Sequence, residues 1–566
     1  MADLVSRGMA KKNTDDLVNV NNQLTQKANK TVTVDVRDYG FIGDGIVNDT
    51  PNIQAALDYC ESVGGGEVIF PKNKKVKLSK AGNRSIWTWS LSSKFNRFYA
   101  LLVPSNVTIN FNGCELIADN QGTDIINLLE NKNASVDLTE DKNIEIKNVV
   151  LNQNINIDTL AYNNIDSCAV CFQNIDGLVL DNVTVLNSYG YGIRIIDATN
   201  VDFRNKVQID KCLGCNVRLG WQTFKVDRLS INLLVCSDSS NRLTGNAIQG
   251  NTLYMNACSN FNVKEYRQTT SDPVKYIGSV NISNNCSNIY FSKIYSKDTG
   301  FKIQDYSADG TAQPNNIVID DMFTEGVLGT PLFYLMGEYT KINSLKCKNL
   351  GEFWINNGRY TQFGRAIFDK STFVVKGNLP KEVHFDKLVL YNSNVSFQSN
   401  GGLDIVSIKE LSIRWDATTT TGSYLKLLDV QCKSMTIGSI VYKLDGSMAT
   451  GGTQTGGILT CSAGVDVARV GNITDLNAVK KENVVITLSA GNTTTVNLAT
   501  NNIWRDSWLN GLDVELIPVD LTSSIVIYNS FVADTNGQTL KINHSTAAGT
   551  EQFRLVVKGY RRYKLS

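Results

Sequence analysis

The hydrophobic pattern of this chain is strand-like over most of its length. Apolar and polar residues alternate in 107–111 and 143–151, and the pattern returns in 177–185. Further short repeats follow at steps of about 21 to 36 residues, as far as 435–437. Short strands of period two, turned by Asn or Gly, predict coils that share one apolar column. The many asparagines fit such corners, since Asn tolerates left-handed turns and can stack on itself in successive coils.

One amphipathic helix is predicted near the N-terminus. Its apolar stripe lies at i, i+3, i+4 and i+7: Ile53, Ala56, Leu57 and Cys60. We expect Asp49 or Thr50 to cap its first turn, and Pro51 suits the first helical position. The glycines at 64–66 are expected to end the helix. Residues 33–71 therefore predict a strand, a glycine turn, a capped helix, a glycine stop and a second strand.

The same stretch carries a family resemblance. In order it reads Asp38-Tyr39-Gly40, Gly43-Asp44-Gly45, Asp49-Thr50, Ile53-Gln54-Ala55-Ala56, Gly64-Gly65-Gly66 and Phe70-Pro71. This string resembles the opening signature of the pectate-lyase-like, right-handed parallel β-helix superfamily, especially phage tailspikes. Phe41-Ile42 departs from the usual pattern, which has a small residue there. The resemblance implies that the helix plugs the open end of a β-helix, but one fold hosts many activities.

Three domains are expected. Residues 1–32 form a polar leader, in which Leu17, Val20, Leu24 and Ala28 suit a short helix or coiled-coil seam; a frayed terminus is equally consistent. Residues 33–475 form the parallel β-helix. In 476–566, short strands separated by Gly, Asn and Asp predict an antiparallel, sandwich-like β-domain for trimerisation or carbohydrate binding. The expected fold class is all-β: a right-handed parallel β-helix with an N-terminal capping helix, a leader and this C-terminal domain.

The composition limits the classes of partner that we expect for this chain. Among 566 residues, 42% are hydrophobic and 19% charged, and the formal net charge is +1. This balance gives no reason to expect nucleic acid or an anionic membrane as partner. No apolar run reaches the roughly 18 residues of a membrane span, and the first 30 residues lack the apolar core of a signal peptide.

Cysteines and histidines bear on metal chemistry. The 12 cysteines are mostly scattered, and we expect them to be reduced and buried. The pairs Cys168–Cys171 and Cys212–Cys215 could suggest zinc, but residues three apart in a strand point to opposite faces. With two histidines in the chain, a His-dependent hydrolase or a three-His metal site is not expected. We therefore expect neither a metal site nor a cofactor.

A strip of outward side chains is the predicted binding surface. Arg194 faces outward if Ile193 and Ile195 face inward, and Arg218 is placed in the same way one coil later. The residues expected to bind substrate are Tyr189, Tyr191, Arg194, Arg218, Trp221, Tyr254, Lys302 and Trp354. Aromatic rings stack on sugars, and cations bind carboxylate or phosphate. Two neighbouring cations also need an anion between them, either Asp197 or Asp202 or an acidic group of the ligand.

Glycoside hydrolysis needs two carboxyl groups about 5 to 9.5 Å apart. The candidate catalytic residues beside the strip are Asp166, Asp197, Asp305, Asp309 and Glu352. Each could equally cap a turn. A lyase would instead use an Arg base, for which Arg194 and Arg218 would serve, and the sequence leaves both reactions open.

The resemblance implies a phage tailspike-like protein of the virion tail. We expect it to be made in the host cytoplasm, to form a homotrimer, and to attach through its N-terminus to a tail or baseplate protein. Its expected task is to bind and depolymerise a host surface polysaccharide or a teichoic-acid-like glycopolymer. The alternative is a non-catalytic receptor-binding or structural tail protein of the same fold. A secreted pectate lyase is disfavoured by the missing signal peptide and by the leader.

Overall fold

The computed structural model describes most of the chain. The residues it describes are 32–87, 94–120, 124–134, 139–156, 167–221, 224–239, 251–273, 276, 278–304, 313–326, 333–356, 358–376, 382–398, 404–415, 428–431, 434–444, 459–461, 466–475, 482–497, 513–520, 524–532, 539–547 and 549–558. The chain divides into two compact units, residues 1–344 and 345–566, and β21 (Tyr339–Lys348) contains the point of division. The predicted leader, apart from its last residue, lies outside the described residues, and the predicted boundaries at 32 and 475 remain predictions.

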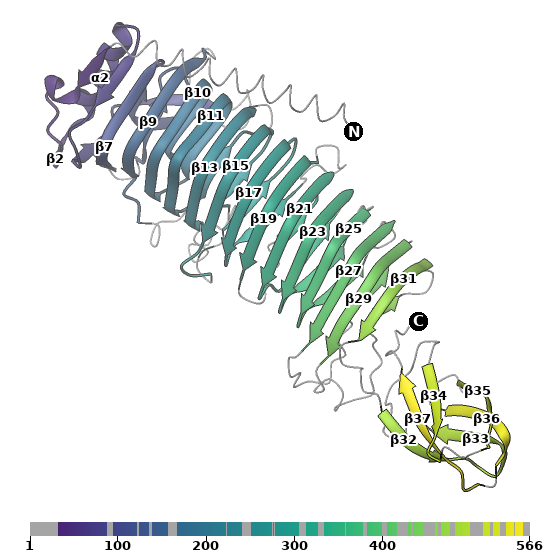
Figure 1. The fold of residues 1–566 in the computed structure, drawn as a ribbon. Coiled ribbons are helices and arrows are strands. Elements are labelled where there is room, and N and C mark those ends of the chain that lie inside the picture. Colours follow the sequence, from purple (N-terminus) through teal and green to yellow (C-terminus); the bar gives the residue numbers. More distant parts are fainter. Residues whose placement is uncertain are drawn as a thin grey trace. The chain divides into compact units, whose positions relative to one another are not determined.

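The first unit begins with the predicted order of elements. These are β1 (Thr33–Asp35), the 3-10 helix η1 (Val36–Tyr39), β2 (Asp44–Asn48), α2 (Thr50–Ser62) and β3 (Gly66–Ile69). The predicted stripe of α2 is confirmed, because Ile53, Ala56, Leu57 and Cys60 are all 0% exposed. The helix packs against β1, β3, β6 and β7, so it covers the end of the stacked strands (Figure 1).

The predicted side-chain cap of α2 needs correction at Asp49. Its buried carboxylate does not cap the helix but accepts hydrogen bonds from the backbone N–H groups of Ile42 (2.8 Å) and Gly43 (2.9 Å). Asn48 instead accepts from the N–H of Thr50 at 3.1 Å. A carboxylate accepts hydrogen bonds from the N–H groups nearest to it. For Asp49 these belong to the glycine turn at 42–43 and not to the first turn of α2.

The glycines after α2 are required by close backbone contacts. Gly65 has φ +117°, and a Cβ there would lie 2.4 Å from the carbonyl oxygen of Asn106. Gly66 has φ +154°, with a Cβ position 2.4 Å from the carbonyl oxygen of Val32. A side chain at either position would therefore separate the helix end from the strands below it.

Two columns of parallel strands build the first unit. The column of long strands comprises β7 (Val107–Ala118), β9 (Asp141–Asn152), β10 (Cys168–Ser188), β11 (Tyr191–Cys212), β13 (Val226–Ser239), β15 (Cys258–Thr269), β17 (Ser287–Lys297) and β19 (Asn315–Glu325). The column of short strands comprises β6 (Lys94–Val103), β8 (Ile126–Asn131), the first residues of β10 and β11, β12 (Cys215–Leu219), β14 (Leu253–Met255), β16 (Ser279–Ile282), β18 (Gly300–Ile303) and β20 (Phe333–Leu335).

Each strand pairs in parallel with the equivalent strand of the next coil, which is the topology of a parallel β-helix (Figure 1). The fold class predicted from the sequence is thus confirmed. Besides these columns, β4 (Lys75–Leu78) pairs with β2 and β7, and β5 (Gly82–Trp87) forms an antiparallel pair with β6.

The core is a ladder of inward side chains in register. Along the long strands, one ladder runs through Ile109, Ile146, Leu180, Phe203, Ile231, Val263, Phe291 and Ile319, all at most 1% exposed. Adjacent parallel strands lie about 4.8 Å apart, so each side chain stacks on the one in the preceding coil. Burial of such a ladder is the main stabilising contribution of the coils.

Asparagine forms the corners, as predicted. Many corner asparagines have positive φ, among them Asn143 (54°), Asn182 (54°) and Asn288 (55°). Their amides also bond between coils: Asn143 Nδ2 donates to Asn106 Oδ1 at 2.9 Å, and Asn288 Nδ2 donates to Asn260 Oδ1 at 3.1 Å. Asparagine therefore tolerates the left-handed backbone at the corner, and its amide forms a hydrogen bond with the asparagine of the neighbouring coil.

The second unit contains further parallel coils. Its strands are β22 (Phe353–Asn356), β23 (Tyr360–Asp369), β24 (Thr372–Lys376), β25 (Glu382–Tyr391), β26 (Asn394–Gln398), β27 (Ile405–Trp415), β28 (Leu428–Gln431), β29 (Ser434–Leu444), β30 (Leu459–Cys461) and β31 (Asp466–Asp475). They pair in parallel with the next strand but one.

Strands after residue 475 pair antiparallel. The first sheet has the order β32 (Glu482–Thr487), β37 (Gln552–Lys558), β34 (Asp513–Pro518), and the second has β33 (Gly491–Asn497), β36 (Thr539–Ala547), β35 (Ile527–Val532). Ile486 and Leu555 of the first sheet share an apolar cluster with Val496 and Leu540 of the second. Among the described helices, none is long and apolar enough to cross a membrane.

Candidate functional site

The outward positions of the short strands form one straight column. In successive strands the register aligns Glu130, Cys171, Arg194, Arg218, Tyr254, Asn281, Lys302 and Tyr334. Arg194 and Arg218 are paired directly, as their flanking aliphatics predict, and Ile193, Ile195 and Val217 are all 0% exposed. The register predicted for Arg194, Arg218, Tyr254 and Lys302 is therefore confirmed, whereas Tyr189, Tyr191 and Trp221 do not lie in this column.

Most of the strip is not on the surface, and this corrects the expected exposed groove. The residues concerned, with their exposed fractions, are Arg194 (2%), Arg218 (5%), Tyr254 (4%), Tyr189 (1%) and Tyr191 (4%). Tyr189 packs with Ile125, Ile155, Leu213 and Tyr276. An outward side chain is exposed only if no other part of the chain covers it, and here side chains distant in sequence do so.

Arg218 lies among three aromatic rings. Its guanidinium carbon is 4.0 Å from the ring centre of Trp221 and 5.1 Å from those of Tyr191 and Tyr254. It also donates to the hydroxyl of Tyr191. Ring faces attract a cation, so these contacts help to hold the buried charge. The aromatic residues predicted to stack on sugar thus contact a cation of the protein itself.

Replacing Arg218 by alanine is expected to lower the free energy of unfolding by about 2 kcal/mol or more, since desolvated cation–π contacts are lost and a cavity remains. Chemical denaturation of the full chain measures this. Arg228→Ala is the matched control, because its side chain is 45% exposed and its ion pair with Asp227 (3.4 Å) is on the surface. Equal stability of the two variants would contradict the role of Arg218 in packing.

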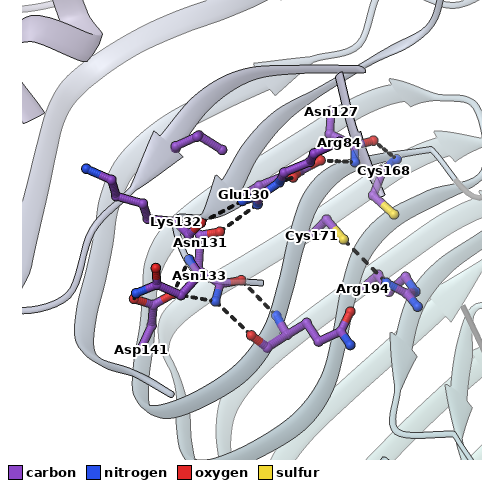
Figure 2. Close-up of polar contacts among 12 residues, drawn as sticks. Arg84, Asn127, Glu130, Asn131, Lys132, Asn133, Asp141, Cys168, Cys171 and Arg194 are labelled. Carbon is purple, nitrogen blue, oxygen red and sulfur yellow. Dashed lines mark hydrogen bonds and ion pairs between the residues drawn. The ribbon is translucent and has the colours of Figure 1, made fainter. Parts of the chain in front are cut away.

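Arg194 contacts a pair of cysteines. Its NH1 group donates to Cys171 Sγ at 3.4 Å (Figure 2). A hydrogen bond from Cys168, helped by the charge of Arg194, lowers the pKa of the Cys171 thiol to about 7, whereas burial raises the pKa of Cys168. The two thiols contact each other, contrary to the opposite faces that strict alternation predicts for residues three apart in a strand.

The Cys171 thiol predicts a pH dependence of stability. Its folded-state pKa of about 7 lies below the reference value of 9.0, so the contribution is present above pH 9 and is lost as the pH falls from 9 to 7. A shift of this size corresponds to roughly 2–3 kcal/mol at most. Unfolding of the wild type and of Cys171→Ser should therefore differ more at pH 9 than at pH 6.5. A constant difference across this range would contradict a Cys171 thiolate.

An anion was expected between Arg194 and Arg218. Among the described contacts, neither Asp197 nor Asp202 bonds to either arginine. Asp202 pairs with Arg204 (2.7 Å). Asp197 lies at a left-handed corner (φ 52°), where burial, with a smaller effect of the Glu140 charge, raises its pKa. Among the described residues, Arg194 contacts the Cys171 thiol and Arg218 contacts the aromatic rings.

A buried ion pair precedes these residues in the column and was missed in the sequence. Glu130 is 0% exposed, and its Oε2 accepts from Arg84 Nε at 2.5 Å (Figure 2). The other guanidinium nitrogens of Arg84 donate to the carbonyl oxygens of Lys132 and Asn131, both at 2.6 Å. Asn127 donates to Glu130 Oε1 at 2.6 Å. A carboxylate directly after the apolar residues 128–129 was the available signal.

A second group of charges lies on the outer face of the long strands. Arg204 bonds both Asp202 and Glu145 (3.3 Å), and Glu145 also accepts from Thr108 at 3.1 Å. Because both carboxylates contact one guanidinium, they are less than roughly 9 Å apart, which does not exceed the largest separation used by glycosidases. The side chain of Asp202 is 32% exposed, whereas that of Glu145 is 10% exposed.

The remaining predicted residues are dispersed. Asp166, Asp305 and Asp309 lie outside the described residues. In the second unit, the half-buried Trp354 donates through Nε1 to Glu352. In the first unit, Lys302 is half-buried above Tyr334. Their catalytic and binding roles remain predictions. No group of three or more His, Cys, Asp or Glu in the described part of the chain is arranged to hold a metal ion.

Comparison with known proteins returns structural likeness only. No protein-family model matches the chain, and no curated protein matches it. Among solved structures, the tailspike protein of E. coli bacteriophage HK620 in complex with a pentasaccharide is 12% identical, with 93% of each chain covered and a TM-score of 0.41. A double mutant of that tailspike has the same identity and coverage and a TM-score of 0.46. The parallel strand pairing of the chain itself carries the assignment of its fold.

Proposed function

We propose that this protein is a tailspike-like phage tail protein that binds a glycopolymer of the host cell surface and cleaves it. The observation that carries the proposal is the segment 33–71. Its resemblance to the start of tailspike β-helices is matched by a helix that buries its stripe on the end of stacked parallel coils. In such coils the outward side chains form straight columns, with about 4.8 Å between the strands that carry successive side chains. This regular spacing suits a linear polymer.

The proposal includes assembly and location. The chain forms a homotrimer, attaches through its N-terminal residues to a tail or baseplate protein, and acts in the virion tail after synthesis in the host cytoplasm. Cyclic homo-oligomers are the common arrangement for repeated chains of this kind. Light scattering of the full chain measures the oligomeric state, and a stable monomer at micromolar concentration would contradict the trimer.

For cleavage, we propose the pair Glu145 and Asp202, whose carboxylates share the guanidinium of Arg204. Hydrolysis requires one carboxyl to protonate the leaving oxygen and another to activate water or attack the sugar. The neighbouring Arg204 keeps two acids close together in one ion network. We therefore assign hydrolysis to this face rather than to the buried strip.

The alternative, a non-catalytic receptor-binding or structural tail protein, is favoured by one observation. The cations and aromatics expected to grip the polymer, such as Arg194 and Arg218, are buried and packed against the protein's own side chains. A protein with this fold can bind a receptor through its other outward columns without breaking a bond.

One experiment separates these functions. The full chain is incubated with a panel of purified bacterial surface glycopolymers. New reducing ends indicate hydrolysis, a product with new ultraviolet absorption indicates a lyase, and binding without either indicates a receptor-binding protein. Glu145→Gln and Asp202→Asn should abolish new reducing ends while binding persists. Absence of binding to every polymer would overturn the proposal.

A further inference from the structure

Lys302 is a partly buried lysine for which the described part of the chain provides no carboxylate partner. It lies on β18 between Phe301 and Ile303, which are both 0% exposed and fix its side chain on the outer face. Burial lowers its pKa, and no charged group contributes to the shift. In the described part of the chain, the recorded contact of its ammonium is the ring of Tyr334, 5.8 Å away.

The other half-buried lysines of this unit are paired. Lys147 bonds Glu67 at 2.9 Å, and Lys77 bonds Asp119 at 3.1 Å. A desolvated ammonium without an anion is unfavourable, and a protein that keeps one commonly uses it for binding or catalysis. An incoming carboxylate or phosphate would supply the missing anion and raise the pKa of Lys302.

The neighbours of Lys302 offer complementary contacts. In the adjacent strands, Asn281 is paired with it on one side and Tyr334 on the other, so the three side chains span about 10 Å. The ring of the half-buried Tyr334 can stack on a sugar, whereas Asn281 is only 2% exposed. An ammonium is a compact point charge for an acidic group.

We propose that Lys302 and Tyr334, with Asn281 beside them, form a subsite for an acidic sugar unit, one that carries a carboxylate or a phosphate. This inference rests on the proposed binding of a glycopolymer and narrows its substrate class to anionic polymers. Lys302 supplies the charge, and Tyr334 supplies a face for the sugar ring. The subsite lies within one unit and does not use the buried arginines.

The test compares binding of three polymers by the full chain: one bearing uronic acids, one bearing phosphate, and one neutral. Lys302→Gln should weaken binding of an acidic polymer by about tenfold or more, whereas Lys302→Arg, which keeps the charge, should retain most of it. Lys293→Gln is the matched control, an exposed lysine on β17, and should bind as the wild type does. The acidic polymer whose binding is weakened by Lys302→Gln identifies the acidic group as carboxylate or phosphate.

A second readout excludes a merely structural role. Because burial disfavours the charged form, Lys302→Gln should leave the melting temperature unchanged or raise it. The NMR signal of the Lys302 side chain should also report a higher pKa on titration with glucuronic acid or inorganic phosphate.

Four results would overturn the subsite. Unchanged binding of the acidic polymers by Lys302→Gln, or wild-type binding of the neutral polymer alone, rejects it while the proposed function stands. A lower melting temperature of Lys302→Gln would show that the lysine acts in packing. If the wild type binds no polymer, both the function and the subsite are rejected.

Discussion

Leu57→Asp is expected to prevent stable folding of the first unit. Leu57 is 0% exposed and belongs to the stripe by which α2 covers the end of the coils. Burial of a leucine contributes about 1.5–3 kcal/mol, and the new carboxylate would lie among apolar groups without a partner. The combined loss should exceed about 4 kcal/mol, a large part of the stability of an ordinary domain. Urea denaturation of the full chain, followed by circular dichroism, measures it.

Tyr59→Asp is the matched control on the same helix. Tyr59 is 46% exposed, so the same new charge would face water two residues away. Its loss should stay within about 1 kcal/mol, since the residue gives up little beyond its ring contact with Tyr39. If Leu57→Asp unfolds at the same urea concentration as Tyr59→Asp, α2 does not seal the core.

The fold was predictable because its signals are local. The stripe of α2 needs a reading of eight residues, 53–60, at helical spacing, and the asparagine corners need only the left-handed preference of one residue type. Register was predictable for a similar reason: Ile193 and Ile195 must face inward, which fixes Arg194 between them and places it opposite Arg218.

Burial of the site could not be predicted in this way. Tyr189 lies between β10 and β11 and packs with Ile125 and Tyr276, which are far from it in sequence. The bond between Arg84 and Glu130 likewise joins residues 46 positions apart, through the antiparallel pair β5–β6 that interrupts the coils. Periodicity in the sequence predicts to which face of a strand a side chain points. Whether that side chain is buried depends on where segments distant in sequence pack.

The other errors concerned the partners that we predicted for particular side chains. The Asp49 carboxylate could serve either the helix or the glycine turn, and both are adjacent in sequence. Cys168 and Cys171 were assigned to opposite faces on ideal alternation, whereas their thiols contact each other. In both cases the residue was identified correctly and its partner was not.

Glu130→Ala is expected to be the most damaging polar substitution in the described part of the first unit. It would leave the Arg84 guanidinium, whose side chain is 11% exposed, without its counter-charge, and the Asn127 amide without its acceptor. Removal of one partner from a buried ion pair costs about 3–5 kcal/mol, because the remaining charge stays desolvated. Thermal and urea unfolding of the full chain measure the loss.

Two further variants decide whether charge or packing is responsible. Glu410→Ala breaks an exposed pair with Lys387, whose side chains are 58% and 44% exposed, and should cost no more than about 1 kcal/mol. The double variant Arg84→Leu, Glu130→Leu removes both buried charges and should be more stable than Glu130→Ala, since replacing a whole buried pair by apolar groups is often neutral. Recovery will be partial, because the carbonyl groups of Asn131 and Lys132 lose the donors that Arg84 supplies. A double variant no more stable than Glu130→Ala would mean that cavity formation, and not the stranded arginine, accounts for the loss.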